Sequence, residues 1–126
     1  MDLDEAKLAE YQAGARRRRE AREAAQAERR ARTLDLAREA ARFLRETYHV
    51  TRVVVFGSAA RGRFFDERSD LDLAVWDLDE RLYFRAQGQI LAFHSDVEPE
   101  IEIDLVRYED ASPALRAAVD REGVEV

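Results

Sequence analysis

The first quarter of the chain is rich in helix-forming residues but poor in large apolar side chains. From Asp4 to Arg32 the sequence is dominated by Ala, Arg, Glu and Gln, which all favour helix, and glycine occurs only at Gly14. Opposite charges recur four residues apart, a spacing at which each pair stabilises a helix by about 0.2–0.5 kcal/mol. Because no wide apolar stripe runs along this stretch, we expect a long helix that projects as an arm.

The next segment has the apolar spacing of a helix that packs on a core. Four apolar residues recur every four positions: Leu36, Ala40, Leu44 and Tyr48. They predict a helix from about Leu34 to Tyr48, and the pattern leaves open whether a break near Thr33 separates it from the arm. We therefore expect two parts, a helical arm of residues 1–33 and a domain of residues 34–126.

Three short apolar runs have the character of strands, and further helices are expected around them. The runs are Val53–Phe56, Leu71–Trp76 and Glu100–Val106. Asp79 is a suitable cap for a helix over residues 80–94, and Ser112 with Pro113 for a helix that ends at Gly123. Residues 124–126 are suited to a short edge strand. The expected fold class is α/β of the α+β kind: a small mixed sheet, helices mainly on one face, and the long N-terminal helix.

Composition and charge narrow the classes of protein that fit. Cysteine is absent, which excludes disulfides and thiolate metal sites. No apolar run approaches the roughly 20 residues of a membrane helix, and the N-terminus lacks the apolar core of a signal peptide, so we expect a cytoplasmic protein without membrane contact. Residues 51–126 carry 17 acidic and 9 basic side chains. This imbalance argues against direct binding of nucleic acid, and an anion held there needs bridging cations.

The run Arg16–Arg19 in the arm is the exception to this acidic balance. Acidic residues are interleaved on both sides of it, as in a solvated helix face. Docking against an acidic partner helix is the alternative interpretation.

A glycine-serine turn follows the first predicted strand. Gly57 allows the backbone to approach a phosphate closely and to adopt a positive φ, and Ser58 offers a hydroxyl and an N–H to phosphate oxygens. The turn is also suited to open a short helix with its N-terminus directed at an anion. Arg61, one helical turn further on, is either a cation for the phosphates or a surface arginine, and the sequence favours neither.

Three carboxylates occupy matching positions on the predicted strands. Asp70 and Asp72 are two residues apart, so their side chains leave one face of a strand about 6.5–7 Å apart. Asp104 has the same parity in the third predicted strand, where we expect Glu100 and Glu102 to be solvent-facing. Oxygen-only ligands suit Mg²⁺ or Mn²⁺, and two-metal phosphoryl transfer uses ions about 3.5–4 Å apart.

Together, the turn and the carboxylates resemble the nucleotidyltransferase superfamily of the DNA polymerase β type, and more narrowly the minimal nucleotidyltransferases (MNT). The resemblance is carried by residues 53–62, 69–73 and 103–106, with the Ser112-Pro113 segment after them, and covers about residues 34–126. It implies the nucleotidyltransferase fold and ATP as substrate.

The resemblance also implies roles for the site residues. Gly57 and Ser58 would hold the nucleotide triphosphate, with Arg61 as a further candidate for nucleotide binding. The carboxylates would bind two Mg²⁺ ions and act in catalysis: Asp70, Asp72 and Asp104. The last of these would also help to deprotonate the attacking hydroxyl.

Minimal nucleotidyltransferases typically act beside a small helical HEPN protein as toxin–antitoxin pairs. The resemblance therefore implies an antitoxin that transfers AMP from ATP to a tyrosine of the HEPN ribonuclease and silences it. We find no segment left to form an acceptor-binding domain, so the acceptor surface is expected from that partner or from a homo-oligomer. The N-terminal helix is the expected docking or dimerising element.

Two other functions fit the same residues. One is a non-catalytic module that binds a nucleotide or a partner through this fold, although all three carboxylates are present. The other is a small-molecule adenylyltransferase, of the kind that modifies aminoglycosides, working as a dimer. Metal-dependent release of pyrophosphate separates the first from an enzyme, and activity without a protein partner identifies the second.

Overall fold

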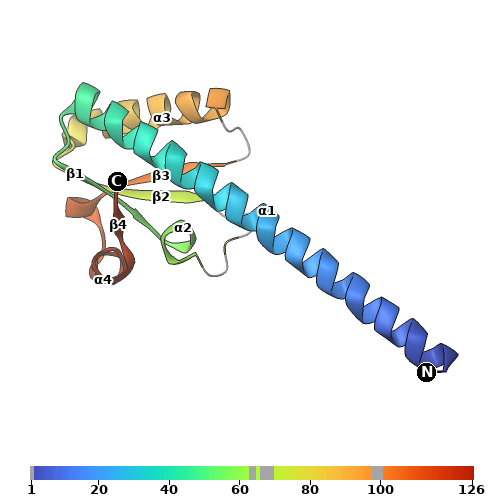
Figure 1. Cartoon of the computed structure of the whole chain (residues 1–126). Helices are drawn as coiled ribbons and strands as arrows, with labels where there is room; N and C mark the ends of the chain where they lie inside the picture. Colours follow the sequence, from blue (N-terminus) through green and yellow to red (C-terminus); the bar gives the residue numbers. More distant parts are fainter. Residues whose placement is uncertain (1, 63–64, 66–69, 98–100) are drawn as a thin grey trace.

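A single long helix gives the molecule its shape. The structure is a computed structural model that describes residues 2–62, 65, 70–97 and 101–126. Helix α1 runs from Leu3 to Tyr48, which corresponds to a length of about 70 Å. Its N-terminal half projects away from the rest of the chain and its C-terminal half lies along the sheet (Figure 1). The two helices expected from the sequence are therefore one.

The helix passes through Thr33 without a break, and the side chain of this residue stays against the helix. Thr33 is fully buried, and its hydroxyl donates to the backbone carbonyl of Arg29 one turn earlier, at 2.8 Å. The helix begins after Asp2, whose carboxylate accepts from the backbone N–H of Glu5 at 2.8 Å. It ends at His49, whose φ of 58° is left-handed. The histidine therefore acts as a cap, in agreement with the expected helix end.

Four strands form one mixed sheet. They are β1 (Arg52–Phe56), β2 (Leu71–Trp76), β3 (Ile103–Arg107) and β4 (Val124–Glu125). The order is β3-β2-β1-β4, with β2 and β3 parallel and the other neighbours antiparallel. The bounds of β2 are those predicted. The strand expected over residues 100–106 is shifted, and residue 100 lies outside the described residues.

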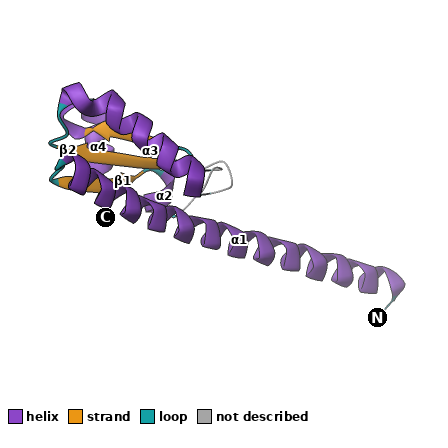
Figure 2. Cartoon of the chain, turned by 90° about the horizontal axis from the view of Figure 1, so that it is seen from above, coloured by secondary structure: helices purple, strands orange, loops and turns teal. Residues whose placement is uncertain are grey.

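Helices cover both faces of the sheet, with more of them on one face. The C-terminal half of α1 and helix α3 (Tyr83–Val97) lie on one face, and α4 (Pro113–Glu122) lies on the other (Figures 1 and 2). The main core between α1, α3 and the sheet contains alternate strand residues: Val53, Val55, Leu71, Leu73, Val75, Ile103 and Leu105. A smaller core under α4 contains Val54, Phe56, Ala74 and Val119. The expected fold class is confirmed.

The two helices predicted after β2 are present, and their capping residues are those expected. The helix expected over residues 80–94 differs at both ends. Asp79 accepts from the backbone N–H of Arg81 at 2.9 Å, but it caps a 3₁₀ turn, Glu80–Leu82, that precedes α3. Helix α3 itself continues to Val97. Ser112 caps α4 as predicted, because its hydroxyl oxygen accepts from the N–H of Leu115 at 3.2 Å. Within the described ranges, no helix combines the length and apolarity needed to cross a membrane.

Candidate nucleotide and metal site

The glycine-serine turn connects β1 to a short helix, α2 (Ser58–Arg61), as the sequence predicts. Gly57 has φ 75° and ψ −154°, a conformation that side chains strongly disfavour. A Cβ at this position would lie 2.5 Å from Oδ2 of Asp72. Glycine is therefore required for two reasons, its backbone conformation and its close approach to a carboxylate on the next strand.

The register of the sheet brings the predicted carboxylates to one face. Asp72 is the partner of Phe56 on β1 and of Asp104 on β3, so the three residues form a row across the strands. Asp70 comes just before β2 and two residues before Asp72, so both side chains leave the same face of the sheet. This face is the one that α4 partly covers, opposite the main core. The backbone N–H of Leu71 donates to the carbonyl of Glu102 at 2.8 Å and holds the starts of the two strands together.

Electrostatics show that these acidic residues act on one another. Burial raises the pKa of Asp72 to about 6, and the negative charges of Asp104 and Asp70 contribute to the rise. The guanidinium of Arg61 acts in the opposite direction. A half-buried carboxylate beside two others is a position where a cation is favourable, since the cation relieves both the repulsion and the lost solvation.

The geometry matches a divalent cation only in part. Carboxylate oxygens are the donors that Mg²⁺ prefers, and the strand alternation directs them to one face. Among the described residues, however, no three acidic or histidine side chains converge closely enough to hold a metal ion. Asp104 is exposed, while Asp70 and Asp72 are partly buried. The charges and donor types therefore fit the ion, but the side chains do not form a closed coordination shell.

Arg61 lies between the candidate site and α4. Its Nη1 donates to Oε2 of Glu122 at 2.9 Å, and this hydrogen bond lowers the pKa of Glu122. The charge of Arg61 also opposes part of the rise in the pKa of Asp72. Arg61 is therefore an ion-paired residue that also lies close enough to Asp72 to act on its pKa.

Two residues that the sequence analysis did not select contact the backbone around the site. Gln87 of α3 donates to the carbonyl of Ile103 and accepts from the N–H of Leu105, both at 3.1 Å. Its amide therefore binds the backbone of β3 on each side of Asp104. Arg30 of α1 donates to the carbonyls of Ala59 and Ala60 in α2. No local motif identifies either residue, because their partners are distant in sequence.

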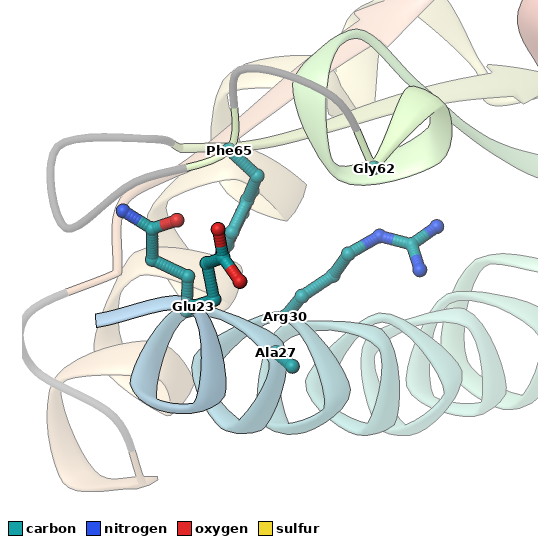
Figure 3. A pocket seen from close by; sticks show the side chains of 6 residues that line it. Glu23, Ala27, Arg30, Gly62 and Phe65 are labelled. Atoms are coloured by element: carbon teal, nitrogen blue, oxygen red, sulfur yellow. The ribbon is translucent and has the colours of Figure 1, made fainter. Parts of the chain in front are cut away.

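A pocket lies between α1 and the chain that follows α2. It has a volume of about 310 Å³, and its lining includes Glu23, Arg30, Gly62 and Phe65. Figure 3 shows Arg30 extending from α1 toward Gly62, with Phe65 approaching α1 from the other side. Ser69, which belongs to the 69–73 segment of the resemblance, lies outside the described residues.

Comparison with known proteins gives the family of this chain. Residues 38–126 match the family model of the polymerase beta nucleotidyltransferases. A comparison with curated proteins found no match. Among solved structures, a minimal nucleotidyltransferase is 30% identical with a TM-score of 0.55, over 80% of this chain and 95% of that chain.

Two toxin–antitoxin complexes contain chains with the same fold. A complex with AMP-PNP is 22% identical over 69% of each chain, with a TM-score of 0.53. The MntA–HepT complex is 20% identical over 71% of this chain and 68% of that chain, with a TM-score of 0.51. The family model covers most of the chain, including the turn and all three carboxylates. The chain therefore belongs to the polymerase beta nucleotidyltransferase family.

Proposed function

We propose that this chain is a metal-dependent nucleotidyltransferase that transfers AMP from ATP to a tyrosine hydroxyl of a HEPN toxin and so acts as its antitoxin. The observation that carries the proposal is the register pairing of Asp72 with Asp104, with the backbone of Gly57 directly against Asp72. This arrangement brings a turn suited to phosphate and a set of carboxylates suited to cations to the same end of the sheet.

The proposed reaction is an in-line displacement at the α-phosphorus of ATP. The tyrosine oxygen forms a bond to the α-phosphorus while the bond from this phosphorus to the oxygen that bridges to the β-phosphate breaks. AMP remains on the tyrosine oxygen and pyrophosphate leaves. The carboxylate of Asp104 accepts the hydroxyl proton, and Gly57, Ser58 and Arg61 orient the phosphates. Positioning and charge stabilisation supply most of the rate in reactions of this kind.

Asp70, Asp72 and Asp104 are the residues that would hold the metal. When bound, two Mg²⁺ ions supply positive charge that neutralises the triphosphate, and Mn²⁺ is a suitable substitute. The raised pKa of Asp72 fits this role, because a cation favours the ionised form that burial disfavours.

The proposed class of acceptor comes from the similarity to chains of toxin–antitoxin complexes. The AMP-PNP complex and the MntA–HepT complex are both toxin–antitoxin pairs, which supports a nucleotide substrate and a toxin partner for this chain. The arm projects away from the sheet and exposes Leu3, Leu8 and Tyr11. Among the described residues, none of the core side chains packs against these three. We place the partner contact on this part of α1.

Transfer to the partner is the direct test. The chain is incubated with ATP, Mg²⁺ and the product of the neighbouring gene, and the partner is examined for added AMP by mass spectrometry. Asp70→Asn removes a proposed metal ligand, and Asp35→Asn is the matched control, since Asp35 is an exposed acid of α1 whose partner is Arg38. We expect AMP on a partner tyrosine with wild type and Asp35→Asn, and none with Asp70→Asn.

Other outcomes identify the alternatives. Release of pyrophosphate with a small-molecule acceptor, and no modification of the partner, would favour a small-molecule adenylyltransferase. Nucleotide binding without any metal-dependent turnover would favour a non-catalytic module. Equal AMP transfer by Asp70→Asn would contradict the proposed role of the carboxylates.

A further inference from the structure

The long helix contacts the segment that carries the nucleotide turn, through a residue outside the part of the chain matched by the family. Nε of Arg30 donates to the carbonyl of Ala59 at 2.8 Å, and Nη2 donates to the carbonyl of Ala60 at 3.2 Å. Arg30 precedes the match, which begins at residue 38. The contact therefore joins α1, at a residue before the matched range, to the turn that follows β1.

Helix α2 is too short to hold its own position. It has four residues, and among the described residues its turn is closed by two backbone hydrogen bonds, from the N–H of Arg61 to the carbonyl of Gly57 at 3.1 Å and from the N–H of Gly62 to the carbonyl of Ser58 at 3.0 Å. An isolated turn of helix is unstable, and the last carbonyls of any helix lack partners within it. The carbonyls of Ala59 and Ala60 are the next two along the chain, and Arg30 provides their donors.

The contact is close and partly enclosed. The guanidinium carbon of Arg30 lies 3.2 Å from the position of a Cβ on Gly62, so a side chain there would press on Arg30. Gly62 has φ 76°, which also favours glycine. The neighbouring Arg29 places its guanidinium 5.9 Å from the ring centre of Phe65. One turn of α1 thus contacts the chain on both sides of Gly62, and Figure 3 shows Arg30 reaching toward this glycine.

We propose that Arg30 is a positioning residue for the nucleotide turn: by holding the carbonyls of Ala59 and Ala60, it fixes Ser58 relative to the carboxylates on β2 and β3. Arg30 does not touch the reacting atoms. Its effect is to keep α2 in the orientation that presents Ser58 to phosphate, so its loss weakens nucleotide binding and leaves the chemical step nearly intact. The nucleotide part of this inference rests on the proposed function, whereas the anchoring of α2 does not.

Three variants separate this role from a general contribution to folding. Arg30→Met keeps most of the side-chain length and removes every donor, and Arg30→Lys keeps the charge and the ability to donate. Arg38→Met is the matched control, because Arg38 is an exposed arginine of the same helix that pairs with Asp35 at 2.8 Å. Thermal unfolding of each variant checks that the fold is retained.

The first measurement is binding of AMP-PNP in the presence of Mg²⁺, followed by kcat and KM for ATP in the transfer assay. Charged hydrogen bonds of this kind are strong enough for their loss to weaken binding about tenfold. We expect Arg30→Met to raise the Kd and KM about tenfold with kcat within about twofold, Arg30→Lys to restore most of the affinity, and Arg38→Met to match wild type. Equal affinity of wild type and a folded Arg30→Met would overturn the inference.

The second measurement is amide hydrogen exchange of Arg61 and Gly62 without nucleotide. Their N–H groups close α2, so faster exchange in Arg30→Met, and not in Arg38→Met, is expected if Arg30 anchors this helix. Unchanged exchange would overturn the anchoring role whatever the nucleotide does. If Arg30→Met exchanges faster but the wild-type protein binds no nucleotide, the anchoring role of Arg30 is supported and the proposed function is contradicted. If Arg30→Met fails to fold, the same two measurements on Arg30→Lys are decisive, with smaller effects of the same sign.

Discussion

Asp72 lies directly opposite Asp104 in the register of β2 and β3, and burial together with the negative charge of Asp104 raises the pKa of Asp72 to about 6. The two residues are neighbours because β2 and β3 are paired in this register, and paired residues of adjacent strands point to the same face of the sheet. The protein therefore holds like charges together at a point where its own side chains provide little compensation, apart from Arg61.

The pH dependence of stability follows from the sign of this shift. An unfolded chain has the ordinary aspartate pKa of 3.8, whereas folded Asp72 titrates near 6, so the folded state holds the proton more tightly. The ionised carboxylate is destabilising, and this destabilisation is absent below about pH 4, grows as the pH rises to 6, and is complete above it.

Asp72→Asn should therefore raise the melting temperature at pH 8 in the absence of divalent cations and change it little at pH 4. Thermal unfolding of both proteins at the two pH values measures the difference, with Asp35→Asn as the exposed control. A gain for Asp72→Asn that is larger at pH 4 than at pH 8 would show that the sign is wrong.

Divalent cations should reverse the order of stability between these proteins. Adding Mg²⁺ at pH 8 stabilises the folded state by an amount that increases with its affinity for that state, so wild type gains and Asp72→Asn gains less. Asp104→Asn should behave in the same way, because it removes the opposite ligand. The melting temperature is followed as Mg²⁺ is added, and an equal gain in all three proteins would exclude a cation site at these residues.

Gly57→Ala tests the close approach of the turn to β2. The new Cβ would lie 2.5 Å from Oδ2 of Asp72, on a backbone with φ 75° and ψ −154°. Strain of this kind costs about 1–3 kcal/mol, so we expect a loss of that size in urea unfolding and a loss of nucleotide binding.

A double-variant cycle divides this cost between its two causes. In an Asp72→Ala background the carboxylate is gone, but the backbone strain remains. The cost of Gly57→Ala should then be smaller without disappearing. The same cost in both backgrounds would mean that the carboxylate moves away freely and that only the backbone conformation requires glycine.

Local patterns in the sequence were sufficient to predict the strands and the turn that carry the candidate site. They could not predict contacts between elements that are distant in the sequence. The alternation around Asp72 predicted the bounds and the faces of β2, because a strand with one apolar face fixes its own parity. The sequence left continuity at Thr33 open because threonine is a poor helix former. In the structure this residue is buried and its hydroxyl bonds to the backbone of its own helix. Arg30 and Gln87 could not be selected, because long polar side chains on a helix usually face solvent and only the packing of α1 and α3 gives them backbone partners.

Gln87 should be needed for the position of Asp104. Its amide makes two bonds to an edge strand, to the carbonyl of Ile103 and the N–H of Leu105. Gln87→Met keeps the side-chain volume and leaves both backbone groups without these partners, at a cost of about 1–3 kcal/mol. We expect this loss in urea unfolding together with faster amide exchange of Leu105. The control is Gln12→Met on the exposed arm, which should match wild type, and an unchanged Leu105 amide in Gln87→Met would show that β3 does not depend on this side chain.

The arm should contribute to partner binding without contributing to the stability of the domain. Residues 2–22 include no buried side chain, whereas Arg29, Thr33 and one face of the helix beyond them are buried. Deleting residues 2–22 should leave the melting temperature nearly unchanged, since most helical stability in proteins comes from packing. The deletion also keeps Arg30, so nucleotide binding should persist while complex formation with the partner is lost.

Tyr11→Glu, which changes one exposed apolar residue of the arm, should also weaken the complex, and Glu10→Gln is the neighbouring control. Sedimentation of the chain alone shows whether the arms instead pair two copies, and a complex that survives the deletion would move the partner contact from the arm to the domain.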